Sequence, residues 1–246
     1  VAIGINTLYS NTTGNSNVSV GYSTMYANTT GSFNVAVGLQ SLASNTTGQY
    51  NVGLGYHALK CNTIGFQNTA IGYQSLKTNT TGFHNTAVGL NTLYSNTTGI
   101  QNTAIGNSAL YNTTTGAQNT AVGYNSLHGN IIGEANTAIG NYALYVNTAT
   151  GNSAIGFEAL RCNTTGELNV AVGRTAMCAN TTGKCNVAIG SYAMQNNTIG
   201  IDNTALGRGA LGANTTGNQN VAIGSFALTT NTTGIQNTAI GRSALY

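Results

Sequence analysis

The chain of 246 residues contains no proline and no tryptophan, and only 4% of its residues are charged. Globular domains carry roughly 25% charged residues, so this composition is not that of an ordinary globular protein. The formal net charge of +3 comes from seven basic and four acidic side chains scattered along the chain. No basic stripe forms, and we therefore expect no nucleic-acid partner. No apolar run approaches the ~20 residues that a membrane span needs, so we expect no direct membrane insertion.

The residues that catalysis and metal binding need are also sparse. The only acids and histidines are Glu134, Glu158, Glu167, Asp202, His57, His84 and His128. They occupy different positions of scattered repeats, so no acid–base pair or triad recurs. No C-x-x-C pair and no Cys/His spacing suited to zinc is present. The sequence therefore predicts a protein that is not an enzyme and holds no metal or cofactor.

Four cysteines are present, namely Cys61, Cys162, Cys178 and Cys185. Cys178 and Cys185 lie within one repeat, which leaves a disulfide between them open. The interpretation that we favour is that all four are substitutions at variable positions. On either interpretation the redox compartment stays open.

What dominates the chain is a repeat of seventeen residues, seen clearly as N-T-A-I-G-Y-Q-S-L-K-T-N-T-T-G-F-H from Asn68 to His84. We number its positions 1 to 17 from the opening Asn, and call the residues at one position in successive repeats a column. Short periods of this kind are typical of solenoids, in which each unit packs on its neighbours. One unit is shortened, where Asn147 to Gly151 runs directly into Asn152. The sequence predicts a single repeat array over 1–246, a segment of a longer fibre protein with no capping repeats visible.

The columns predict short β-strands joined by tight turns. Position 4 is Ile, Val or Leu in every repeat, and position 9 is Leu or Met. Because side chains alternate along a strand, positions 2 and 4 share one face, which we assign to the core. Glycine at positions 5 and 15 predicts turns, and positions 8–10 are expected to form a second strand, an extended segment or one helical turn. The predicted fold is all-β, a parallel β-solenoid (β-roll) of about fifteen seventeen-residue coils.

Asparagine fills position 1 and almost all of position 12, where Thr113 is an exception. Stacked Asn side chains can form amide hydrogen-bond ladders, and Asn tolerates the backbone of tight turns. Thr at position 13 is a candidate for a parallel hydroxyl ladder. The predicted position-1 ladder comprises Asn17, Asn34, Asn51, Asn68, Asn85, Asn102, Asn119 and Asn136.

Many position-12 asparagines also begin N-T-T, which is an N-glycosylation sequon. Asn62, Asn130 and Asn147 keep the Asn but lose the sequon, so side-chain ladders explain the column better than glycan attachment does. Candidate glycosylation sites remain at Asn11, Asn28, Asn45, Asn79, Asn96, Asn112, Asn163, Asn180, Asn214 and Asn231.

Position 3 is Ala almost throughout, and only Ser19 and Gly53 differ. If positions 2 and 4 face the core, position 3 faces outward, and a uniformly small outward column is suited to a flat face pressed against another chain. The alternative is that Ala packs under a neighbouring turn. The predicted oligomer interface is Ala36, Ala70, Ala87, Ala104, Ala121, Ala138, Ala154, Ala171, Ala188, Ala205, Ala222 and Ala239.

Aromatic residues recur at positions 6 and 10, and they are the candidates for receptor contact because tyrosine joins a rigid apolar ring to a hydroxyl. The interpretation that we favour is that they cap the coil edges or pack between protomers. They are Tyr22, Tyr56, Tyr73, Tyr124 and Phe157 at position 6, and Tyr9, Tyr26, Tyr94, Tyr111 and Tyr145 at position 10.

The segments N-V-A-V-G at Asn34 to Gly38 and N-V-A-I-G at Asn186 to Gly190, with N-T-A-I-G elsewhere, resemble the core motif of trimeric autotransporter adhesin (YadA-like) heads. Related repeats occur in phage and viral tail-fibre proteins. The YadA-like heads are left-handed parallel β-rolls with three chains side by side, and the repeat of this chain is longer by its N-T-T-G turn. The resemblance implies a homotrimer and an extracellular, cell-surface or virion-surface fibre involved in attachment.

These observations predict a structural or adhesive surface fibre segment, a rigid shaft or head that presents attachment functions. Its expected partners are further copies of itself and a host receptor or surface glycan. The alternative is a monomeric β-solenoid that binds ice or glycans through a flat face of Thr and Asn side chains.

Overall fold

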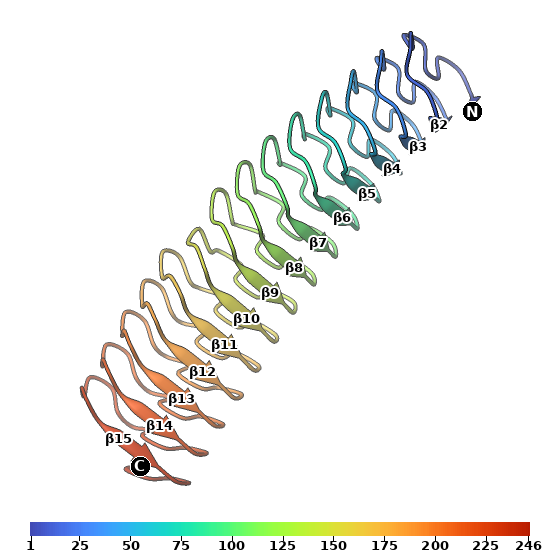
Figure 1. Cartoon of the computed structure of the whole chain (residues 1–246). Coiled ribbons are helices and arrows are strands. Elements are labelled where there is room, and N and C mark those ends of the chain that lie inside the picture. Colours follow the sequence, from blue (N-terminus) through green and yellow to red (C-terminus); the bar gives the residue numbers. More distant parts are fainter. The chain divides into compact units, whose positions relative to one another are not determined.

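The computed structural model describes all residues from Val1 to Tyr246 and is an all-β parallel β-solenoid (Figure 1). It contains no helix, so none that would reach across a lipid bilayer. Backbone packing divides the chain into two units, Val1–Asn119 and Thr120–Tyr246. Each is a stack of the seventeen-residue coils that the sequence predicts.

Each coil contributes one short strand, formed by positions 2 to 4. The strands of the first unit are β1 (Ala2–Ile3), β2 (Val18–Val20), β3 (Val35–Val37), β4 (Val52–Leu54), β5 (Thr69–Ile71), β6 (Thr86–Val88) and β7 (Thr103–Ile105). Those of the second unit are β8 (Thr120–Val122), β9 (Thr137–Ile139), β10 (Ser153–Ile155), β11 (Val170–Val172), β12 (Val187–Ile189), β13 (Thr204–Leu206), β14 (Val221–Ile223) and β15 (Thr238–Ile240).

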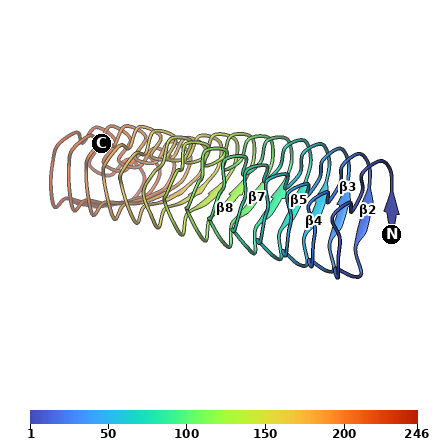
Figure 2. The ribbon, with the colours of Figure 1, turned by 90° about the horizontal axis from the view of Figure 1, so that it is seen from above.

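Within each unit, neighbouring strands pair in parallel and in register. Ala70 of β5 is opposite Ala87 of β6, and Ala171 of β11 is opposite Ala188 of β12. Figure 2 shows strands β2 to β5 side by side along one side of their coils. Every column is therefore a line of like residues that runs from coil to coil.

The rest of the coil bends through residues with positive φ. Positions 7, 9 and 17 adopt the left-handed conformation, for example Gln74 (φ 54°), Leu76 (φ 47°) and His84 (φ 58°). For a residue with a side chain this conformation costs roughly 1–2 kcal/mol. Each of these three backbone N–H groups donates to a carbonyl of a neighbouring coil, at 2.8 Å, 3.0 Å and 3.2 Å respectively. The strand or helical turn expected at positions 8–10 is wrong, because position 9 turns the chain instead of extending it.

The strand side chains face the opposite way from the prediction. Position 3 points into the coil, and positions 2 and 4 point out, so that Ile71 and Ile105 are 38% and 42% exposed. Gly53, which replaces Ala in the position-3 column, shows how little room there is: a β-carbon there would lie 2.5 Å from Ser41 Oγ and 3.4 Å from Leu42 Cγ. One coil encloses room for the position-9 Leu and a methyl group, so the small residue occupies the interior.

The prediction that the position-3 alanines form an outward oligomer interface is therefore wrong. They are core residues, with no exposed surface in the folded chain apart from 3% at Ala239. Together with the position-8 side chains, which are Ala, Ser or Thr, and the position-9 Leu or Met, they fill the apolar half of each coil. The corrected residues are Ala36, Ala70, Ala87, Ala104, Ala121, Ala138, Ala154, Ala171, Ala188, Ala205, Ala222 and Ala239.

Candidate functional site: asparagine ladders and an exposed sheet face

The polar half of each coil is built from the position-1 asparagines. Asn68 donates from Nδ2 to Asn51 Oδ1 at 3.2 Å and to the Gly82 carbonyl at 2.9 Å. Its Oδ1 accepts from both the backbone N–H and the side-chain amide of Asn85, at 3.0 Å and 3.2 Å. The same contacts link Asn17, Asn34, Asn51, Asn68, Asn85, Asn102 and Asn119. These buried amides thus satisfy one another, as buried polar groups must.

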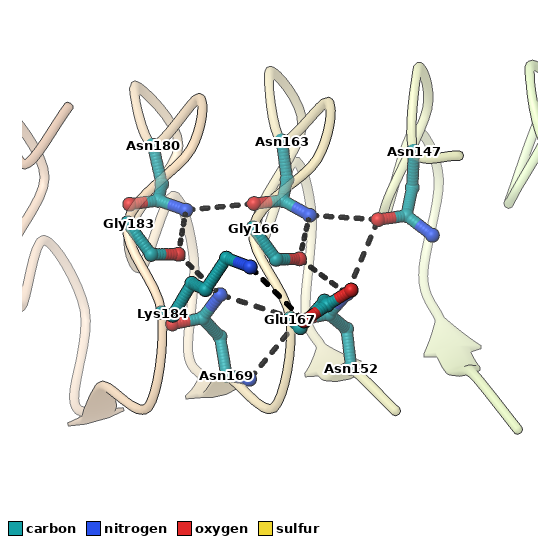
Figure 3. Close-up of polar contacts among 9 residues, drawn as sticks. All are labelled: Asn147, Asn152, Asn163, Gly166, Glu167, Asn169, Asn180, Gly183 and Lys184. Atoms are coloured by element: carbon teal, nitrogen blue, oxygen red, sulfur yellow. Dashed lines mark hydrogen bonds and ion pairs between the residues drawn. The ribbon is translucent and has the colours of Figure 1, made fainter. Parts of the chain in front are cut away.

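A second ladder runs through position 12, and it meets the first at the position-15 glycine. Asn180 Nδ2 donates to Asn163 Oδ1 at 2.7 Å and to the Gly183 carbonyl at 3.1 Å. Asn169, from the position-1 column, donates to the same carbonyl at 2.8 Å. Figure 3 shows the two ladders joined at these glycine carbonyls. Each coil is therefore tied to the next through its interior as well as through its strand.

This junction explains why position 15 is glycine. A β-carbon on Gly31 would lie 2.5 Å from Asn28 Oδ1 and 2.5 Å from the Gly48 carbonyl oxygen. Such distances are too short for any side chain. Glycine is required here by the close approach of the two ladders.

The shortened coil connects the ladders differently and uses a different carbonyl. The Asn152 backbone N–H still donates to Asn136 Oδ1 at 2.9 Å, but Asn152 Nδ2 donates across to Asn147 Oδ1 at 3.2 Å. Asn136 and Asn147 both donate from Nδ2 to the Ala149 carbonyl, at 2.7 Å and 2.9 Å. Asn163 then donates to Asn147 Oδ1 at 2.7 Å (Figure 3). Strand β10 keeps its register on β9, with Ala154 opposite Ala138. The missing residue is absorbed entirely in the turn.

The position-12 ladder is interrupted where Thr113 replaces Asn, and the buried Asn96 Oδ1 has no hydrogen-bond partner. An unsatisfied buried acceptor costs about 1–3 kcal/mol. We expect Thr113→Asn to raise the free energy of unfolding by about 1–2 kcal/mol, because its Nδ2 supplies the missing donor. Chemical denaturation followed by circular dichroism measures this change. Thr113→Asp introduces a side chain with the shape of Asn but without its amide donor, so this variant should have a lower free energy of unfolding. Equal effects of the two variants would contradict the ladder.

The ladder geometry also determines which candidate glycosylation sites are accessible in the folded chain. In the folded chain, Asn28, Asn45, Asn79, Asn96, Asn163, Asn180 and Asn214 have no exposed surface. A glycan attaches through Nδ2, and in these residues Nδ2 donates to the position-15 carbonyl, as in Asn45 to Gly48 at 3.0 Å. The prediction of accessible glycosylation sites is therefore wrong for these seven. Asn11, Asn112 and Asn231 are half-buried.

The position-13 threonines of the N-T-T-G turn do not form an array of free hydroxyls. Thr46 Oγ1 at position 13 donates to the Thr63 carbonyl of the next coil at 3.1 Å, and Thr80 does the same to Thr97 at 3.0 Å. The hydroxyl column thus bonds to backbone carbonyls and reinforces the stacking. The Asn columns are buried, so the exposed part of the face in the alternative prediction consists of the position-14 threonines, such as Thr47, Thr81 and Thr98.

The aromatic columns form stacks along the surface. Tyr9 and Tyr26 at position 10 lie with ring centroids 5.1 Å apart and planes within 3°. Tyr56 and Tyr73 at position 6 stack at 5.0 Å. The spacing follows the ~4.8 Å separation of neighbouring strands. These rings therefore pack against one another rather than standing free.

In each unit, the outward side chains at positions 2 and 4 of its strands, β1 to β7 in the first unit and β8 to β15 in the second, form what we call the sheet face. Its position-4 column is aliphatic in every coil, and its position-2 column is Val, Thr or Ser in every coil. No charged residue occurs in either column. Exposed position-4 residues include Val37, Ile71, Ile105, Ile139, Ile155, Ile189 and Leu206, each between 38% and 45% exposed. The sequence identified these residues but assigned them to the core.

The reactive side chains do not gather into a site. No group of three or more His, Cys, Asp or Glu side chains comes together, and all four cysteines are free thiols, Cys178 and Cys185 included. Burial raises the pKa of the Cys178 thiol. The two ion pairs, Arg161–Glu158 and Lys184–Glu167, each measure 3.1 Å and lie on the surface. The asparagine ladders and the sheet face are the two extended features of the molecule.

No protein-family model, curated protein or solved structure matches this chain. The function is therefore inferred from the geometry and from the sequence motifs.

Proposed function

We propose that the chain is a structural segment of a surface fibre in which three copies associate side by side through the sheet face. The observation that carries this proposal is the position-4 column, which is aliphatic in every coil although its side chains are exposed or half-exposed. A monomer gains little from such a column, because its own core is filled by positions 3, 8 and 9. Large exposed apolar surfaces are typical of protein interfaces.

The energy available at the sheet face is comparable with the cost of association. Fully burying a Val, Leu or Ile side chain contributes ~1.5–3 kcal/mol, so burying the exposed two fifths of one contributes roughly 1 kcal/mol. Over the array this amounts to on the order of 10 kcal/mol for each protomer. Association costs about 4–15 kcal/mol in lost freedom of motion. The absence of charge from both columns means that no ion has to be desolvated.

The proposed role of this assembly is mechanical. Each coil is tied to its neighbours by the strand, both asparagine ladders and the position-13 hydroxyls, so a stack of coils resists bending and local unfolding. Such a segment holds an attachment function away from a cell or virion surface, outside the cell. Its partners are further copies of itself and, through the fibre as a whole, a receptor or surface glycan.

A triple substitution tests the interface. Ile71→Lys, Val88→Lys and Ile105→Lys together place three charges on the sheet face of β5 to β7. We expect the assembly to dissociate to the 25.1 kDa monomer while the circular dichroism spectrum stays of the β type, because these side chains do not enter the coil. Light scattering measures the mass.

The matched control carries the same three charges on the exposed position-14 threonines, as Thr81→Lys, Thr98→Lys and Thr115→Lys. This variant should keep the mass of the parent. If the sheet-face variant also keeps that mass, the sheet face is not the interface.

A further inference from the structure

The second unit contains a surface hollow of about 340 Å³ in the segment that follows the strand, over positions 6 to 11 of three successive coils. Its floor is the coil of β13, at Gly209, Gly212 and Ala213. Tyr192 and Gln195 border it on the β12 side, and Phe226 and Thr229 on the β14 side. Its volume falls within the ~300–1,000 Å³ that small-molecule sites span.

The hollow exists because one coil lacks side chains that its neighbours have. Gly209 is the only glycine at position 7 of the array, and Gly212 is the only glycine at position 10. The three atoms nearest to a β-carbon on Gly212, at 3.1 to 3.9 Å, would all belong to the Gly209 backbone, so no side chain lies closer to this space. At Gly209 the space is occupied by the Phe226 ring, which lies 2.8 Å from where a β-carbon would stand.

The backbone groups of the floor are already hydrogen-bonded. Gly212 N–H donates to the Gly209 carbonyl at 3.1 Å, and the Gly212 carbonyl accepts from Asn196 N–H at 3.2 Å. The Thr229 hydroxyl also donates to the Gly209 carbonyl, at 3.2 Å. The floor therefore presents mainly Cα–H surface, against which a ring can lie without leaving backbone groups unpaired.

The rim offers one positive charge and two aromatic rings. Arg208 lies beside the Phe226 ring, with its guanidinium carbon 5.4 Å from the ring centroid, and it makes neither of the two ion pairs of the chain. Arg174 covers the Tyr192 ring at 5.8 Å, and Tyr192 also lines the hollow. Arg174, Arg208 and Arg242 share the position-6 column, so the potential along this edge is positive.

We propose that this hollow binds a sugar ring that carries a carboxylate. The C–H groups on one face of a sugar ring are weakly positive and pack on the negative face of an aromatic ring such as Tyr192. The guanidinium of Arg208 is shaped to bind a carboxylate with two hydrogen bonds. The side-chain amides of Gln195 and Asn196 at the rim provide both donors and acceptors for hydroxyls. The hollow is formed within one chain, so this site does not depend on the proposed assembly.

Titration calorimetry or ligand-observed NMR with methyl glucuronide and its neutral counterpart, methyl glucoside, tests the proposal. We expect the acidic sugar to bind the 246-residue chain with a Kd in the roughly millimolar range, as is usual for an open site with few contacts. The neutral sugar should bind at least about tenfold weaker, because it lacks the partner of Arg208. Arg208→Gln should remove this preference.

Gly212→Gln fills the hollow with the side chain type that Gln195 supplies at the same position of the preceding coil. It should abolish binding of both sugars and leave the circular dichroism spectrum unchanged. Arg242→Gln, in the same column but outside the hollow, should bind as the parent does. No measurable binding by the parent, equal binding of the two sugars, or binding that survives Gly212→Gln would each overturn the proposal.

Discussion

Replacing Ala104 with glutamate should unfold the coil to which it belongs. Ala104 has no exposed surface, and the space around its methyl group is closed by the position-8 and position-9 side chains. The larger side chain adds ~1–3 kcal/mol of overpacking, and an unpaired buried charge costs several kcal/mol more. We expect a loss of more than ~4 kcal/mol, which lowers the thermal midpoint by roughly 10 °C or more. A circular dichroism melt measures this.

Two control variants make the result specific to the direction of the side chain. Ile105→Glu, at the next residue, places the same charge on the sheet face, where Ile105 is already 42% exposed, and it should keep the β-type spectrum at 25 °C. Ala104→Ser should also remain folded, because Ser19 occupies this column with its hydroxyl bonded to the Thr24 carbonyl at 3.2 Å. If Ala104→Glu folds and Ile105→Glu does not, the inward and outward faces are assigned the wrong way round.

Gly173→Ala should lower the free energy of unfolding nearly as much as Ala104→Glu does. Gly173 directly follows strand β11 and has φ +135°, a conformation that residues with a β-carbon rarely adopt. A β-carbon there would lie 2.6 Å from the Gly190 carbonyl carbon and oxygen. Backbone strain of this kind costs ~1–3 kcal/mol, and the clash also separates the coils of β11 and β12. We expect a total loss of ~3 kcal/mol or more, measured as a fall in the denaturation midpoint.

Gly212→Ala is the matched control for that prediction. Gly212 does not have positive φ, and its β-carbon would approach nothing closer than the Gly209 carbonyl oxygen at 3.1 Å. The substitution should change stability by less than ~1 kcal/mol, since the reduced freedom of the unfolded chain offsets the small contact. A loss at Gly212 as large as that at Gly173 would mean that glycine content, rather than this particular turn, limits stability.

The sequence predicted the solenoid because its period is strict, but it did not reveal which side of the strand is inside. Alternation groups positions 2 and 4 together and separates them from position 3, yet it does not say which group is buried. Hydrophobicity favours Ile71 over Ala70 for the interior, and this choice is wrong because the coil is too narrow. The signal that could have corrected it is the uniform smallness of position 3: a column limited to Ala, Ser and Gly is what a confined interior demands.

The candidate sites were predictable to different degrees. The position-1 ladder follows from the sequence, because stacked identical amides have one obvious arrangement. Asn96 Oδ1 lacks a donor because position 12 of the next coil is Thr113. The sequence showed Thr113 as an exception in the Asn column. The hollow at Gly212 escaped detection because it requires knowing that positions 7 and 10 lie on one surface. A comparison of single columns shows an unusual glycine but not the space beside it.

The native mass of the unmodified chain, measured by light scattering in dilute buffer, tests the proposed assembly most directly. We expect a species of three times 25.1 kDa, because three sheet faces then bury their aliphatic columns against one another. A single species of 25.1 kDa with a β-type circular dichroism spectrum would contradict the assembly, since the exposed column would then be stable in water without a partner chain.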